Sequence, residues 1–377
     1  MTAFFSEIKG FIQKEKSYIF LLVLIVFFYA LAFTMHQAVK KSDLGSSLGL
    51  TEEELAIQKE KEEIKARLDE FSDDPQAVQD RLADHPKLSG LAQMFILLFT
   101  FFFGVGIALS LLDLRRWLIT KEFIPGVHRT LAVTWGVSEI IKVVILFFGW
   151  SILLNIALAF LKLGFSQTID SSTLIMFHTL LLDVISIWII ASAIRKTGSQ
   201  FQDLGFSRLL SRRLVFLAKE IWMGIRIYLS IFPILLGILF FLVFVASFFA
   251  YEPPPHPLAE MLLEKKVLSP WIVLLSVLVA CVFGPIVEEV FFRGFFYPAL
   301  KKYWGAGWTT VLTAALFALV HENIFAFLPI FFLGVVLCHL YERRRDLAAC
   351  ISLHMIHNTV FIAYFFLVKS ILSSAGP

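Results

Sequence analysis

The stretch from Glu288 to Arg293 places two carboxylates and a guanidinium inside a run of sequence that is otherwise apolar. Charged side chains at membrane depth are costly unless they are paired or face a wet cavity, so these groups are functional candidates. Glu289 and Arg293 are four residues apart and become neighbours on a helix, whereas Glu288 points about 100° away from Glu289 around the helix axis. We therefore predict that Glu289 is paired with Arg293 and supports the site, while Glu288 is the general base that activates water.

Two further pairs of residues have the same spacing. Phe317 and His321 are four apart, as are His354 and Asn358, so each pair occupies one face of a helix. Counted from the nearest basic loop, Glu288 and His321 lie about 20 Å deep and His354 about 13 Å deep at 1.5 Å per residue. The three motifs are therefore predicted to meet within the membrane.

Such a cluster supports two chemistries. In the first, Glu288 and His321 orient and deprotonate a water molecule, while His354 and Asn358 stabilise the oxyanion formed from a peptide carbonyl. In the second, Glu288, His321 and His354 bind a zinc ion that keeps one position open for water. The sequence contains no HExxH motif, so we favour the mechanism without a metal or other cofactor, although the residues alone leave both open.

The composition indicates the elements that must position these groups. The chain has 377 residues, 58% of them hydrophobic, with a mean hydropathy of +0.79, which is typical of a polytopic membrane protein. The net charge of only +3 arises from basic residues in short loops, which argues against a nucleic-acid partner. The three cysteines lie in apolar runs and are expected to be packing residues.

Since a transmembrane helix needs about 20 apolar residues, we predict an all-α transmembrane bundle of eight to nine spans. The expected spans are Ser17–Met35, Gly90–Leu112, Ile140–Leu163, Thr173–Ile194, Ile227–Ala250, Trp271–Pro298, Trp308–His321, Ile324–Tyr341 and Leu347–Val368. Every second loop is basic, so the N-terminus and these loops are predicted to be cytoplasmic in a cell or inner membrane.

The expected organisation separates an N-terminal membrane region from a catalytic one. Residues 1–250 would hold the first five spans and a mostly helical extracytoplasmic insertion over 36–89, within which a capping box at Thr51–Glu54 opens a helix-like run. Residues 251–269 would form a proline-rich external linker, 270–368 the catalytic membrane domain and 369–377 a short tail.

Polar residues of the earlier spans are assigned structural roles. Asp183 and His178 in the fourth span are five residues apart and do not share a helical face. For this pair we expect an interhelical hydrogen bond, with a role along a substrate path as the alternative. Glu139 and Lys142, near the end of the third span, are expected to form an ion pair.

The ordered motifs EExxxR (Glu288, Glu289, Arg293), FxxxH (Phe317, His321) and HxxxN (His354, Asn358) resemble the CAAX prenyl endopeptidase and bacteriocin-processing family, also called the Abi or lysostaphin-resistance-like family. The resemblance extends from near Pro270 to Val368, and Asp203–Phe206 is similar to the loop that often precedes the family core.

The resemblance implies an intramembrane endopeptidase acting on a membrane-bound protein or peptide, lipid-anchored, prenylated or transmembrane. It assigns the base to Glu288, water binding to His321, the oxyanion hole to His354 and Asn358, and support to Glu289 and Arg293. The family has been described both as metalloproteases and as glutamate-dependent enzymes. Some members act in immunity or as scaffolds, so a non-catalytic scaffold or immunity protein is an alternative. An ion- or proton-coupled transporter is a further alternative because intramembrane charges also form ion paths.

Overall fold

The computed structural model of the chain describes residues 1–45, 83, 85–126, 133–164, 171–206, 214–249, 251 and 270–373. Within these ranges the regular structure is entirely helical, which confirms the predicted all-α class. Most of the predicted insertion, and all of the predicted linker except residue 251, lie outside the described residues. The helices are α1 (Thr2–Lys14), α2 (Lys16–Gly45), α5 (Pro86–Thr120), α6 (Val137–Gly164), α7 (Ser171–Lys196), η1 (Phe201–Leu204), α8 (Leu214–Phe248), α10 (Pro270–Leu278), η2 (Val279–Phe283), α11 (Gly284–Glu289), η3 (Val290–Phe296), α12 (Tyr297–Leu319), α13 (Ile324–Arg344) and α14 (Leu347–Ser373).

The described residues contain eight helical stretches that are long and apolar enough to cross a membrane. They cover 16–35, 86–120, 137–161, 173–196, 214–248, 270–319, 324–344 and 347–370. Many large apolar side chains on their surfaces are exposed, which is typical of helices that contact lipid. The chain is therefore a multi-pass integral membrane protein.

The stretch from Pro270 to Leu319 is a helical hairpin. Its 50 residues would span about 75 Å as one straight helix, more than twice the hydrocarbon thickness of a bilayer. Gly305 interrupts it with φ 68° and ψ −179°, a conformation that glycine adopts readily. The rings of Phe292 and Phe317, on either side of Gly305, lie 5.2 Å apart, so the chain has reversed between them. The hairpin thus supplies two of the nine predicted spans.

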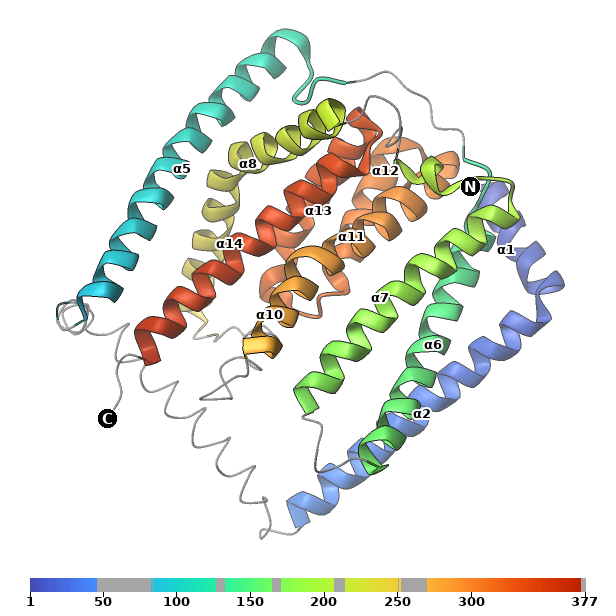
Figure 1. Cartoon of the computed structure of the whole chain (residues 1–377). Helices are drawn as coiled ribbons and strands as arrows, with labels where there is room; N and C mark the ends of the chain where they lie inside the picture. The colour runs from blue at the N-terminus through green and yellow to red at the C-terminus, as the bar shows by residue number, and fades with distance from the viewer. Residues whose placement is uncertain are drawn as a thin grey trace.

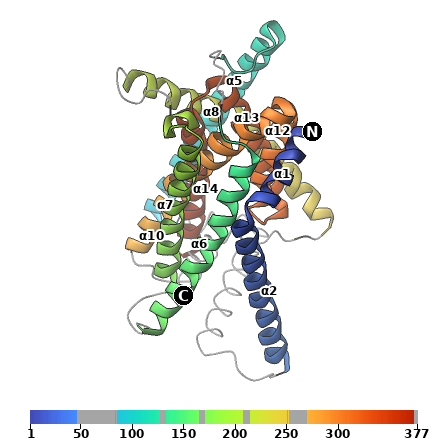
Figure 2. The same cartoon turned by 90° about the vertical axis from the view of Figure 1, so that its right-hand side faces the viewer.

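The C-terminal helices occupy the middle of the bundle (Figure 1). On one side α8 packs against α14, α13 and α5, and on the other side α7 packs against α10, η2, α11 and α6. Figure 2 shows α2 running beside α6, with which it is in contact, at the edge of the molecule. The motif-bearing helices are therefore enclosed by the helices that precede them in the chain.

The connection after α7 fixes the register of this core. Leu204 is fully buried, and its carbonyl accepts a hydrogen bond of 3.1 Å from the Tyr341 hydroxyl. Gly205 has φ 108°, and its carbonyl accepts a hydrogen bond from the Leu347 amide at 3.0 Å. A Cβ on Gly294 would lie 2.8 Å from the Leu204 carbonyl, so η3 approaches this connection as closely as a glycine allows. The segment Asp203–Phe206 noted in the sequence thus joins α7 to η3, α13 and α14.

Candidate active site

The helix that carries the two glutamates is not regular. The six residues of α11 are flanked by the π-helical segments η2 and η3, and such segments are frequent at functional sites. In η2 the amide of Gly284 donates to the Val279 carbonyl, so the next carbonyl, that of Ala280, would need the amide of Pro285. Proline has no backbone N–H. The side chain of Asn358 in α14 replaces it, donating through Nδ2 to the Ala280 carbonyl at 2.8 Å.

Glu289 is the centre of a buried network. Its Oε1 lies 2.7 Å from Arg293 Nη1, and both side chains are fully buried. The same oxygen lies 2.9 Å from Nδ1 of His354. An ionised carboxylate only accepts hydrogen bonds, so Nδ1 of His354 carries the hydrogen and Nε2 is the unprotonated nitrogen in the neutral ring. The ion pair predicted from the spacing of Glu289 and Arg293 is present, and it also sets the tautomer of His354.

Glu288 has the opposite environment. Its side chain is 35% exposed, whereas that of Glu289 is fully buried. Its Oε2 lies 3.9 Å from Nε2 of His354 and has no hydrogen-bond partner among the described residues. The carboxylate folds back along the helix towards Gly284. Its Oε1 lies only 3.7 Å from the position that a Cβ on Gly284 would occupy. Of the two adjacent glutamates, Glu288 is therefore the one that can contact a substrate or a water molecule.

Phe317 separates the two predicted histidines and covers the arginine. The centroid of its buried ring lies 5.1 Å from that of His321, 5.6 Å from that of His354 and 4.2 Å from the guanidinium carbon of Arg293. His321 directs Nδ1 towards the Phe317 carbonyl at 2.7 Å, so its Nε2 faces away from its own helix turn. The three motifs expected to meet within the membrane thus converge around this ring.

Comparison with known proteins places this region in a family. Residues 270–360 match the family described as Rce1-like, type II CAAX prenyl endopeptidase. This segment is an Rce1-like domain. The chain is also 28% identical over 148 residues to the UPF0177 protein YaiF of Lactococcus lactis subsp. lactis strain IL1403, a match that covers 38% of this chain and 65% of that relative. The chain thus spans slightly less than two thirds of this relative's length. No solved structure matches the chain.

The contacts within the Rce1-like domain differ in detail from the pairings expected from the sequence. His354 contacts Glu289 directly and lies 3.9 Å from Glu288, whereas the sequence pattern paired Glu288 with His321. In the expected oxyanion pair, Asn358 donates one amide hydrogen to the Ala280 carbonyl and keeps the second. The sequence signal for this bond was Pro285. Proline has no backbone N–H, so a helix carbonyl four to five residues before it, here that of Ala280, lacks its usual donor. Nothing in the local sequence pointed to the contact between His354 and Glu289.

The acidic and imidazole groups of the Rce1-like domain do not gather as metal ligands. No group of three or more His, Cys, Asp and Glu side chains among the described residues is arranged to hold a metal ion. The zinc set considered from the sequence, Glu288, His321 and His354, therefore does not assemble as a ligand set in this geometry.

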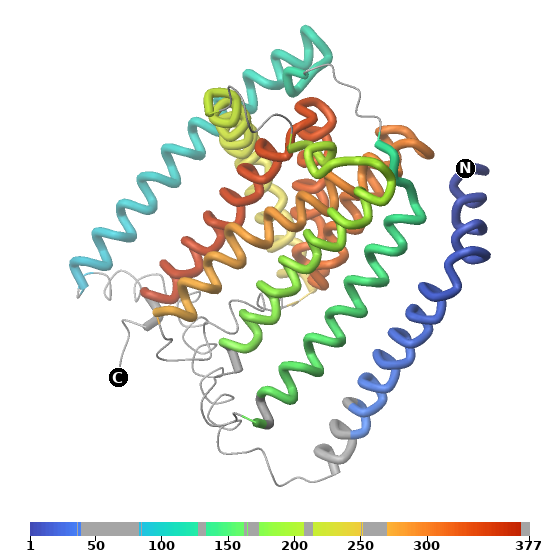
Figure 3. The backbone as a smooth tube through the Cα atoms, turned by 45° about the vertical axis from the view of Figure 1, so that its right-hand side comes forward, coloured from blue at the N-terminus to red at the C-terminus, as the bar shows by residue number. Residues whose placement is uncertain are grey.

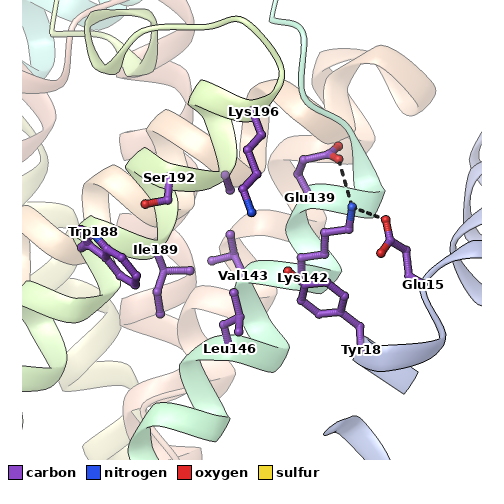
Figure 4. A pocket seen from close by; sticks show the side chains of 11 residues that line it. Glu15, Tyr18, Glu139, Lys142, Val143, Leu146, Trp188, Ile189, Ser192 and Lys196 are labelled. Atoms are coloured by element: carbon purple, nitrogen blue, oxygen red, sulfur yellow. Dashed lines mark ion pairs between the residues drawn. The ribbon is translucent and has the colours of Figure 1, made fainter. Parts of the chain in front are cut away.

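A cavity of about 330 Å³ lies elsewhere, between α6, α7 and the break between α1 and α2 (Figure 4). Lys142 projects towards it and pairs with Glu15 at 2.6 Å and, as predicted, with Glu139 at 3.9 Å. None of the predicted site residues lines this cavity. It is therefore separate from the glutamate site.

Proposed function

We propose that the chain is an intramembrane endopeptidase that hydrolyses a peptide bond in a membrane-presented protein or peptide. The observation that carries this proposal is the difference between the surroundings of the two adjacent glutamates. Glu289 is held by Arg293 and His354, while Glu288 has an unpaired oxygen 3.9 Å from Nε2 of His354. A free carboxylate beside an unprotonated imidazole nitrogen is a site for activating water.

In the proposed mechanism, a water molecule donates one hydrogen bond to Glu288 and the other to Nε2 of His354. Acceptors 3.9 Å apart can both bind one oxygen at about 2.8 Å. Glu288 takes the proton as the water oxygen attacks the peptide carbonyl. The second amide hydrogen of Asn358 would then stabilise the oxyanion. The sequence analysis assigned His354 to the oxyanion, whereas this mechanism assigns it to binding the water.

The proposed substrate follows from the activity that gives the matching family its description, type II CAAX prenyl endopeptidase. A C-a-a-X sequence is a C-terminal motif whose cysteine is prenylated, which anchors the peptide to the bilayer. A lipid-anchored peptide of this kind reaches a site within the membrane without leaving it. We further propose that the N-terminus and the basic loops are cytoplasmic, as the distribution of Lys and Arg predicts.

The base is tested with Glu288→Gln in the full chain purified in detergent. The probe is a fluorogenic S-farnesyl peptide ending in C-a-a-X, assayed beside a membrane-tethered reporter peptide. Loss of general-base catalysis is expected to lower the cleavage rate by at least about 100-fold while the thermal unfolding midpoint stays unchanged. Glu139→Gln is the matched control, since this carboxylate pairs with Lys142 at the separate cavity, and it should cleave like the wild type. Full cleavage by Glu288→Gln would refute the assignment.

The same preparation tests the metal-free mechanism. Cleavage should be insensitive to a chelator, and elemental analysis should find no stoichiometric zinc. Activity that is lost on chelation and restored by added zinc would contradict the glutamate mechanism and leave the endopeptidase assignment intact.

A further inference from the structure

A third carboxylate, that of Asp183, lies on α7, which packs against the helix α11 of the glutamate site. Its Oδ2 is buried and has no hydrogen-bond partner among the described residues, so the interhelical hydrogen bond expected for Asp183 is not found at this oxygen. The Oε2 of Glu288 is likewise buried and has no hydrogen-bond partner among the described residues, and α7 packs against α11, the helix that carries Glu288. Two carboxyl groups with unused oxygens thus lie on helices that pack against each other.

The packing of α7 explains how they meet. The Ser276 hydroxyl in α10 donates to the sulfur of Met176 at 3.3 Å, and Met176 and Leu180 pack in one cluster with Val279. The helices α7 and α10 therefore run in the same direction, as Figures 1 and 3 also show. About one turn beyond Leu180, Asp183 reaches the level of Gly284. The Glu288 carboxylate folds back to that same level.

Asp183 and His354 lie on two different helices, α7 and α14, that both pack against the segment carrying Glu288. The segment α10–α11 lies between α14 and α7 in Figures 1 and 3, and it packs against both. His354 projects from α14, and Asp183 is carried by α7. A peptide bound over Glu288 would therefore have an imidazole on one side and a carboxyl group on the other.

The charges around Asp183 assign its protonation state. Glu289 is neutralised by Arg293 at 2.7 Å, and the histidines near the site are His321, His354 and His357. His178, also on α7, is rotated about 140° from Asp183 at 100° per residue. No ion pair joins Asp183 to a described lysine or arginine, and two unpaired carboxyl groups in apolar surroundings do not both ionise. The base of the proposed mechanism must be ionised, so Glu288 carries the charge in this scheme and the proton is left to Asp183.

We propose that Asp183 is the general acid that protonates the leaving amine. This inference rests on the proposed endopeptidase function. Water forms the new C–O bond and gives a proton to Glu288; the C–N bond then breaks as the Asp183 carboxylic acid gives its proton to the nitrogen. The products are a carboxylic acid and an amine, and transfer of the proton from Glu288 to Asp183 restores the starting state. Two carboxyl groups whose surroundings hold one charged and one neutral are the arrangement that acid–base catalysis uses.

The test compares two leaving groups. The S-farnesyl C-a-a-X peptide is assayed beside its analogue with a thioester at the scissile position, since a thiol ionises near neutral pH and its thiolate leaves without a proton. Asp183→Leu and the nearly isosteric Asp183→Asn should lower peptide cleavage by about 100-fold and leave thioester cleavage nearly unchanged. Glu288→Gln should lower both. Ser186→Ala is the matched control on α7, because the Ser186 hydroxyl bonds only the Leu182 carbonyl of its own helix, at 2.6 Å.

Each other outcome overturns the inference. Peptide cleavage by both Asp183 variants at the rate of Ser186→Ala would show that the carboxyl group is not used. An equal loss on both substrates would show a structural role, since misplacement of the site does not depend on the leaving group. If the wild type cleaves neither substrate, the proposed function itself fails. This result is distinguished from failure of the Asp183 inference alone, because it is seen without any Asp183 variant.

Discussion

The buried pair of Glu289 and Arg293 offers a test of how this site is held together. Both side chains are fully buried and their charged atoms lie 2.7 Å apart, so removing either partner leaves the other as an unpaired buried charge. We expect Glu289→Gln or Arg293→Met to lower the free energy of unfolding by about 3 to 5 kcal/mol. At about 1.4 kcal/mol per tenfold change, this is two to four orders of magnitude in the folding equilibrium.

The double variant separates the ion pair from other effects. With both charges removed no uncompensated charge remains, and the amide introduced by Glu289→Gln would still offer His354 a carbonyl acceptor. We therefore expect the double variant to lose about as much stability as one single variant, well below the sum of about 6 to 10 kcal/mol. Part of the remaining loss comes from the guanidinium that packs 4.2 Å above the Phe317 ring.

The assay is equilibrium unfolding in mixed micelles, followed by tryptophan fluorescence. A control cycle uses Glu15→Gln and Lys142→Met, a pair 2.6 Å apart whose side chains are 31% and 23% exposed. Its coupling energy should be about 1 kcal/mol or less, because solvent screens exposed pairs. Additive losses at Glu289 and Arg293 would refute the reasoning, since the two charges would then not depend on each other.

Two further predictions concern the backbone around the site. Asn358→Leu leaves the Ala280 carbonyl without its 2.8 Å donor and should lower stability by about 1 to 3 kcal/mol, measured by thermal unfolding. Adding Pro285→Ala to that variant returns a backbone N–H to this turn and should recover part of the loss; no recovery would mean that Pro285 is not the cause of the unpaired carbonyl. Gly205→Ala should lower folded yield more than Gly198→Ala, because both glycines have positive φ but only at Gly205 would a Cβ meet a neighbour, the Tyr341 ring at 2.9 Å. Equal yields would show that this close approach does not matter.

The hydrophobic runs and the i, i+4 spacings determined the local features of this protein. Each of the nine predicted spans lies on a described helical stretch or within two residues of one, because a run of about 20 apolar residues has no other stable form in lipid. The helix α8 begins thirteen residues before the predicted Ile227, since its charged first turns, with Lys219 and Glu220, extend beyond the apolar run. The pairing of Glu289 with Arg293 could also be predicted, because residues four apart are neighbours on any helix.

The tertiary structure alone decided which side chains meet across helices. His354 and Glu289 are 65 residues apart in the chain, and Asn358 and Ala280 are 78 apart. Helical periodicity shows which residues share a face, but not the rotation or register at which two helices pack. Those are set by close contacts such as Gly294 against Leu204 and Ser276 against Met176. The sequence by itself therefore predicted the adjacent glutamates and the pairing of one of them, and only the packing of α7 and α14 around them decided their neighbours.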